Sequence, residues 1–212
     1  SIQGYDTAQG NTDSNGYGDF WGTVPTGYLA LCSANLPDPS IALPGEHFNT
    51  VLYTGTGSDA AITGAGFEPD WVWIKNRSGA PDTTAASADQ VRGANNILMP
   101  DSIEAQFTDS SHIQSFDSDG FTIGTNSAVN TNNDNYASWN WLAGGTPTAT
   151  NSAGAGNTPT AGSVKINGSN LGSALAGTIP ATRLTANTTA GFSIVKWAGS
   201  GSNATVAHGL RQ

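Results

Sequence analysis

Residues 47–58 read HFNTVLYTGTGS, residues 62–69 read ITGAGFEP, and residues 70–78 read DWVWIKNRS. The first and last of these runs are dense in β-branched and aromatic residues, and Gly, Pro, Ser or Asp bound each of them. Such a pattern predicts a strand, a turn region and a second strand. We therefore expect a β unit at this point in the chain.

Part of this pattern returns near the C-terminus, where residues 191–210 read GFSIVKWAGSGSNATVAHGL. An alignment without gaps places Phe192 on Phe48 and Val195 on Val51. Long-range similarity of this kind indicates one small β unit used twice. Four more positions agree in the same alignment: Gly55 with Gly199, Gly57 with Gly201, Ser58 with Ser202, and Ala60 with Ala204.

The composition narrows the class of protein. Only 11% of the 212 residues are charged, and the seven Lys and Arg leave a net charge of −9. Nucleic-acid binding is therefore not expected, because no basic stripe is present to neutralise phosphates. No apolar run reaches the length of a membrane span, so membrane insertion is not expected either. Cys32 is the single cysteine, which excludes an intrachain disulfide and leaves a buried structural thiol as the favoured interpretation.

Composition also divides the chain into four segments. Residues 1–23 have the character of an irregular connector, and residues 24–143 that of a β-sandwich module in which residues 29–36 are the one expected short helix. Residues 144–162 lack large apolar side chains and are interpreted as a Gly/Thr/Ala-rich linker, and residues 163–212 as a second, incomplete β module. The expected fold class is all-β: antiparallel β-sandwich modules with long loops and at most one short helix.

Residues 117–120 read DSDG and are flanked by alternating apolar residues, which predicts a β-hairpin. Asp117 and Asp119 are the candidate calcium ligands in this turn. The later ligands of an EF-hand loop are missing, and Asp is common in turns, so we expect no bound metal. A pair of glycosidase carboxylates drawn from the same acids is a further alternative, which sequence cannot place in space.

Four tryptophans occur as two pairs at strand spacing. Trp71 and Trp73 lie two residues apart, as do Trp139 and Trp141, so each pair shares one face of a strand. Packing of both pairs in a common core is the favoured interpretation, because apolar residues lie beside them. The alternative is a platform on which the same four rings stack against glycans.

Signatures of catalysis are scarce. The chain has no GxSxG, HExxH or P-loop motif. His47, His112 and His208 are far apart in the sequence and none pairs locally with Cys or Glu at metal spacing, so each is interpreted as a solvated or hydrogen-bonded residue. No catalytic and no cofactor-binding residue is predicted, and we expect the protein not to be an enzyme.

Several motifs, taken together, resemble a family of tail-fibre-like virion proteins of tailed bacteriophages, many of them marine. The resemblance covers nearly the whole chain and is weakest over residues 151–182. In that family, this region follows a concanavalin-like (SPRY-type) β-sandwich. The motifs are PTGYLALCSANLP at 25–37, HFNTVLYTG at 47–55, GFEPDWVWIK at 66–75, SFDSDGF at 115–121, ASWNWLAGG at 137–145, ANTTAGFSIV at 186–195 and HGL at 208–210.

The resemblance implies a non-enzymatic virion structural protein, a tail-fibre or receptor-binding component that contacts the host surface outside the cell. Its implied partners are other fibre subunits, with a homotrimer expected, and a host cell-surface glycan. The alternatives are a bacterial extracellular adhesin or fibre subunit, and a carbohydrate-binding or carbohydrate-degrading tail-spike domain. The family continues after HGL into a returning strand, which residues 211–212 do not provide. We therefore expect either a fragment of a longer fibre or a strand supplied by another chain.

Overall fold

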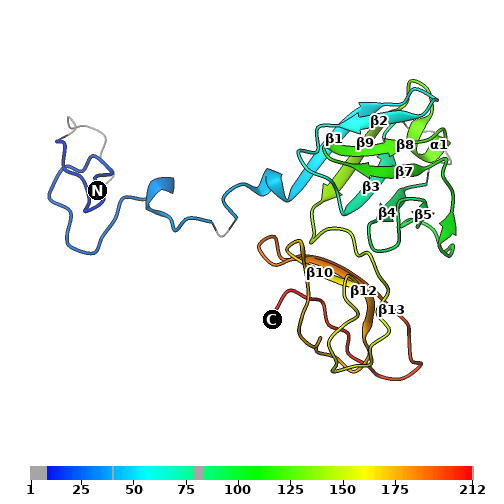
Figure 1. Ribbon diagram of the computed structural model, residues 1–212. Helices are drawn as coiled ribbons and strands as arrows, with labels where there is room; N and C mark the ends of the chain where they lie inside the picture. Colours follow the sequence, from blue (N-terminus) through cyan, green and yellow to red (C-terminus); the bar gives the residue numbers. More distant parts are fainter. Residues whose placement is uncertain (1–8, 40, 79–83, 212) are drawn as a thin grey trace. The chain divides into compact units, whose positions relative to one another are not determined.

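The structure, a computed structural model, describes residues 9–39, 41–78 and 84–211 (Figure 1). It forms two compact units, Ser1–Ala42 and Leu43–Gln212. Almost all regular structure lies in the second unit. Within the described residues, no helix is long and apolar enough to cross a membrane.

The first unit is irregular, as the sequence predicts for its opening residues. The buried carboxylate of Asp13 organises it, because Asp13 accepts hydrogen bonds from the backbone N–H groups of Asn15, Tyr17 and Ala30 at 2.8–3.0 Å. The helix expected over residues 29–36 is wrong, since only the single 3₁₀ turn η1 (Ser33–Asn35) forms there. A short helix needs an apolar face to pack, and the leucines that would supply it are exposed: Leu29, Leu31 and Leu36.

The second unit begins with the 3₁₀ turn η2 (Pro44–Glu46) and continues into a β-sandwich. One sheet is antiparallel throughout, in the order β1-β9-β3-β4, and the facing sheet has the order β2-β8-β7. A two-stranded pair, β5 with β6, and the single short helix α1 complete the module. The bounds are β1 Phe48–Thr54, β2 Ala60–Thr63, β3 Trp71–Asn76, β4 Ala86–Asp89, β5 Asn96–Ile97, β6 Phe107–Thr108, β7 Ile113–Asp117, β8 Gly120–Ile123, α1 Ser127–Asn130 and β9 Asn135–Trp141.

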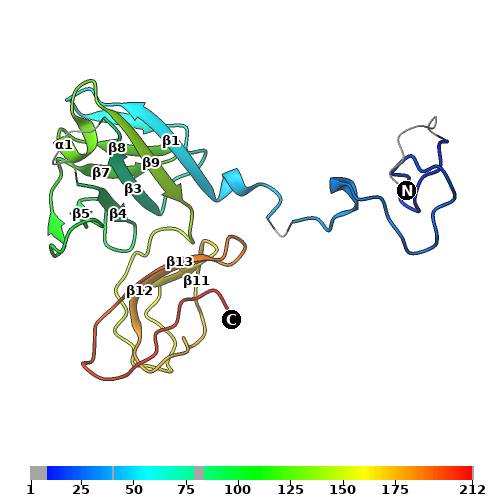
Figure 2. The same cartoon turned by 180° about the vertical axis from the view of Figure 1, so that it is seen from behind.

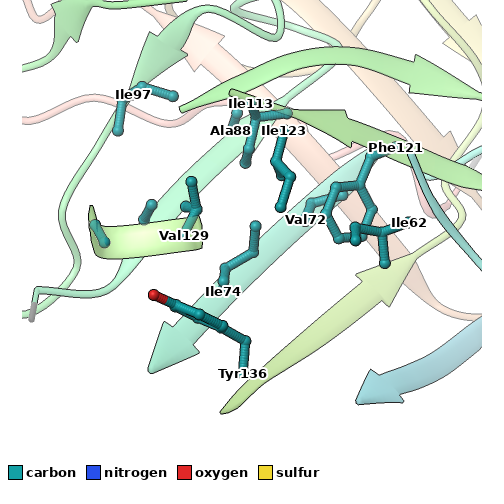
Figure 3. Packing of buried hydrophobic residues seen from close by; sticks show 12 residues of the cluster. Ile62, Val72, Ile74, Ala88, Ile97, Ile113, Phe121, Ile123, Val129 and Tyr136 are labelled. Atoms are coloured by element: carbon teal, nitrogen blue, oxygen red, sulfur yellow. The ribbon is translucent and has the colours of Figure 1, made fainter. Parts of the chain in front are cut away.

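Alternate side chains of the two sheets meet in one core (Figure 3). The first sheet contributes Val72, Ile74 and Tyr136, all fully buried. The second sheet contributes Phe121 and Ile123, and α1 closes one end of the core. Burying a side chain of this size stabilises a fold by roughly 1.5–3 kcal/mol. The all-β fold class predicted from sequence is therefore confirmed.

The strands predicted at the start of the module both form, yet they are not neighbours. β9, from later in the chain, lies between them and pairs antiparallel with β1 on one edge and β3 on the other. The predicted hairpin is confirmed, since β7 and β8 pair across the DSDG turn.

A third sheet follows residues 144–162, which hold no strand or helix. Its order is β11-β10-β12-β13, and all pairs are antiparallel except β10 with β12. Figure 2 shows β12 and β13 side by side. Asn167 and Gly168 make an Asn-Gly turn between β10 and β11, with φ angles of 48° and 82°. The bounds are β10 Val164–Ile166, β11 Ser169–Asn170, β12 Ala181–Asn187 and β13 Phe192–Trp197.

Gly144 joins this sheet to the sandwich. Its N–H donates to Thr185 Oγ1 at 2.8 Å. A Cβ at this position would lie 2.5 Å from the backbone oxygen of Ala186 and 2.7 Å from that of Lys165, so only glycine permits the approach. Composition placed a boundary at residues 144–162, whereas the packing makes Leu43–Gln212 one compact unit.

Candidate functional site: a tryptophan face on the outer sheet

Strand alternation turns all four paired tryptophans outward. On β3, Val72 and Ile74 enter the core, so Trp71 and Trp73 lie on the opposite face. β9 does the same with Trp139 and Trp141. The expectation that these four rings are core anchors is therefore wrong: each is half-buried, and the core cluster does not contain them. The sequence showed that each pair shares a face, and packing decided which face is buried.

The four rings form one contiguous surface, called the tryptophan face below. The register sets Trp71 beside Trp141 and Trp73 beside Trp139. The ring centroids of Trp71 and Trp141 are 4.4 Å apart with planes inclined by 23°, and those of Trp73 and Trp139 are 5.4 Å apart at 48°. Along β3, Trp71 and Trp73 are 6.4 Å apart and nearly parallel. Offset stacking of this kind holds aromatic rings in fixed orientations.

One end of the tryptophan face is covered and the other is open. Phe192 of β13 stacks against Trp71 and Trp141, with centroid distances of 6.0 Å to both. Within the described chain, no ring from outside β3 and β9 stacks on Trp73 or Trp139 in this way. The exposed Thr50 lies opposite Trp139 and flanks this open end, whereas Ser87, opposite Trp73, is buried.

Polar groups around the tryptophan face are mostly engaged. The indole Nε1 of Trp71 donates to Ser87 Oγ at 2.6 Å. Trp73 Nε1 is buried and has no hydrogen-bond partner among the described residues. Further along β3, Lys75 forms a salt bridge of 2.7 Å with Asp101. The open end thus offers flat aromatic rings and the neutral hydroxyl of Thr50, a combination suited to stacking against sugar rings.

Asp70, which sequence reasoning missed, is a buried carboxylate immediately before the tryptophan face. It accepts hydrogen bonds from the N–H groups of Ala143 at 2.6 Å and Gly145 at 3.2 Å. Burial raises the pKa of Asp70 to about 6, against the opposing effect of these two bonds, and nearby Glu68 and Asp89 raise it further. Nothing in the sequence marks this aspartate, because its partners are backbone groups about 70 residues away.

The two candidate calcium ligands are held by hydrogen-bond donors. Asp117 accepts from the hydroxyls of Ser115 and Thr122 at 2.9 and 2.8 Å. Asp119 accepts from the N–H groups of Gly64 and Gly66 at 3.1 and 2.7 Å. Among the described residues, no group of three or more His, Cys, Asp or Glu is placed to hold a metal ion. Both carboxylates therefore serve the turn structure.

The three histidines lie apart, each with its own hydrogen bond. His47 Nδ1 is 3.1 Å from Asn187 Nδ2, and His208 Nδ1 accepts from the N–H of Leu210. His112 is buried, its Nδ1 is 3.0 Å from Asp109, and burial lowers its pKa. The structure brings none of them to the tryptophan face.

Comparison with known proteins identifies a family and nothing more specific. A family model described as a domain of unknown function (DUF7483) matches residues 43–169 and again residues 165–212. Two matches to one model are what the internal repeat predicts. No curated protein and no solved structure matches the chain. Because the two matches span well over half of its length, the chain belongs to the DUF7483 family of domains of unknown function.

Proposed function

We propose that this chain is a non-enzymatic, receptor-binding component of a tail-fibre-like protein of a tailed phage, which contacts glycans on the host surface. The observation that carries the binding function is the open end of the tryptophan face. The assignment to a virion, and hence to an extracellular location, rests on the sequence resemblance described above.

The tryptophan face has the physical properties of a glycan platform. Trp73 and Trp139 are large, half-buried rings fixed by their strands and by mutual contact, so binding would cost little side-chain entropy. Trp71 and Trp141 hold them from one side. Large aromatic side chains gathered on a surface beside polar residues are typical of interaction sites.

The charged groups near this surface support binding more than catalysis. Lys75 is paired with Asp101, and Asp89 forms a salt bridge of 2.6 Å with Arg92. A glycosidase needs two carboxyl groups facing a shared space, one of them able to give up a proton. Asp89 and Glu104 line one cavity beside Trp71, but Asp89 is held by Arg92. The buried carboxylate of Asp70 instead holds the backbone of residues 143–145.

A glycan array followed by titration calorimetry tests the proposal. We expect Trp73→Ala and Trp139→Ala each to weaken glycan binding at least tenfold, because each removes a stacking ring. Trp21→Ala is the matched control, since Trp21 is 72% exposed and belongs to the other compact unit. Unchanged binding in both face variants would refute the glycan platform.

Two further measurements separate the alternatives. Release of reducing ends from capsular polysaccharide would indicate a degrading tail-spike domain. Antibody labelling of the native source in electron micrographs would show whether the protein sits on phage particles, as proposed, or on bacterial surface filaments, as an adhesin would.

A further inference from the structure

The edge of β13 that faces away from β12 is unpaired within the described residues. Successive residues of a strand point their backbone N–H and C=O groups to alternate edges. The N–H of Leu184 donates to the Ser163 oxygen at 3.0 Å, and the oxygen of Ala186 accepts from the N–H of Asn167 at 2.9 Å. Even-numbered residues of β12 therefore bond toward β10, and odd-numbered residues bond toward β13.

The register between β12 and β13 then determines which backbone groups of β13 point to the unpaired edge. Thr185 lies opposite Ile194, so even-numbered residues of β13 bond to β12. The backbone groups of Ser193, Val195 and Trp197 point to the other edge. This edge is accessible: Val195 is half-buried and the Trp197 side chain is 53% exposed.

In the first copy of the repeat, β9 covers the equivalent edge. The N–H of Leu142 donates to the His47 oxygen, and the N–H of Gly55 donates to the Asp134 oxygen, both at 2.8 Å. The register between these two pairs is unbroken, so odd-numbered residues of β1 bond to β9. The residue numbers of aligned positions, such as Phe48 and Phe192, differ by an even number. Odd-numbered residues of β1 therefore correspond to odd-numbered residues of β13.

The space beside the bare edge suits the side chains of β9. A cavity of about 430 Å³ has an apolar part, formed by Trp71, Leu98, Met99, Pro100, Phe192 and Ile194, and a polar part that includes Asp89, Arg92 and Glu104. A second one, of about 350 Å³, continues along β13 to Trp197. In the first copy Trp141 lies opposite Phe48, and Trp139 lies opposite Thr50. Residues directly opposite share a face, so the same strand on β13 would place two tryptophans beside Phe192 and Ile194, next to this apolar groove.

We propose that the bare edge of β13 is a strand-acceptor site for a β9-type strand other than the chain's own β9, which is already paired on both edges. The occupant is an extended, uncharged segment with Trp at alternate positions and Ser or Asn between them. Backbone hydrogen bonds to Ser193, Val195 and Trp197 supply affinity, and the apolar groove selects the large side chains. The site adjoins the Trp71 end of the tryptophan face, and its argument does not depend on glycan binding.

A labelled peptide of residues 135–143, NYASWNWLA, is the probe. Fluorescence anisotropy with the full chain should show saturable binding. Val195→Pro should weaken it at least tenfold, because proline deletes an N–H at the bare edge while sparing the bonds to β12. Leu52→Pro is the matched control: it deletes an N–H at the free edge of β1 and should leave the affinity unchanged. Equal binding by Val195→Pro, or by a scrambled peptide, would overturn the proposal.

Disulfide formation tests the register even if Val195→Pro fails to fold. In a Cys32→Ser background, Val195→Cys should cross-link to the peptide carrying Ser138→Cys, because Val51 faces Ser138 in the first copy. The peptide carrying Ala137→Cys should cross-link at least tenfold more slowly, since that side chain points to the other face. Similar rates for the two peptides would overturn the assigned register. A disulfide dimer of two Val195→Cys chains that excludes the peptide would show β13 pairing with itself instead.

Discussion

Residues of the same strand can lie in the core or on the outer face of this fold. Tyr136 and Trp139 lie in the same strand, yet Tyr136 is fully buried in the core and Trp139 is half-buried on the outer face. Stability and binding are therefore expected to depend on different residues of the same sheet.

Truncation of a core ring and of an outer ring should separate these roles. Phe121→Ala is expected to cost about 3–5 kcal/mol of unfolding free energy, because Phe121 is fully buried. Trp139→Ala should cost only about 1–2 kcal/mol, since part of its surface is already in water. Urea denaturation of both variants measures the difference. Equal losses would show that the outer ring carries as much packing as the core.

The buried carboxylate of Asp70 predicts a pH dependence. Its folded pKa of about 6 lies above the ordinary value of 3.8, so ionisation opposes folding. The stability that the raised pKa contributes is full below pH 4 and is lost as the pH rises through 6. Two pKa units correspond to roughly 3 kcal/mol. In Asp70→Asn, the free energy of unfolding should depend less on pH between pH 4 and 7. An unchanged pH dependence in this variant would show that Asp70 is not its source.

At the scale of elements, the β7–β8 hairpin organises a turn in a neighbouring strand connection. The Asp119 carboxylate accepts hydrogen bonds from the N–H groups of Gly64 and Gly66, which follow β2. Asp119→Ala should therefore cost about 1–2 kcal/mol through the loss of two charge-assisted hydrogen bonds. Thermal unfolding of the variant and of the wild-type chain measures this loss of stability.

The same hairpin allows a test for calcium. Because hydrogen-bond donors occupy Asp117 and Asp119, millimolar Ca²⁺ or a chelator should leave the melting temperature of the wild-type chain unchanged. A ligand that binds only the folded state must stabilise it. A rise in melting temperature with Ca²⁺ that disappears in Asp119→Ala would reveal a calcium site.

For the whole molecule, the bare edge of β13 predicts association between chains. We expect the chain to associate with a separate strand donor and not with a second copy's β9, because β9 is already paired on both edges. In the unassociated chain, the amide of Val195 should exchange with solvent much faster than that of Ile194, which bonds to β12. Sedimentation measures the association, and hydrogen exchange measures the rates of the two amides. A compact monomer in which Val195 is protected would show that the edge is covered internally.

Local patterns were enough to predict the all-β class, the hairpin at residues 113–123 and the repeat that aligns Phe48 with Phe192. Each of these depends on neighbouring residues or on similarity along the chain. The helix predicted over residues 29–36 does not form, and its leucines are largely exposed instead of packed. Pairing of β1 with β9, rather than with β3, joins segments about 90 residues apart and has no local signal.

By itself, the sequence determined where strands and turns lie and which tryptophans share a face. Only the tertiary structure decided that this face is the outer one, that Phe192 covers its Trp71 end, and that Asp70 is buried against the backbone of Ala143. The physical reason is that strand alternation is a property of the local backbone, identical on both faces. Burial and hydrogen-bond pairing depend on which distant segment arrives at each face and edge.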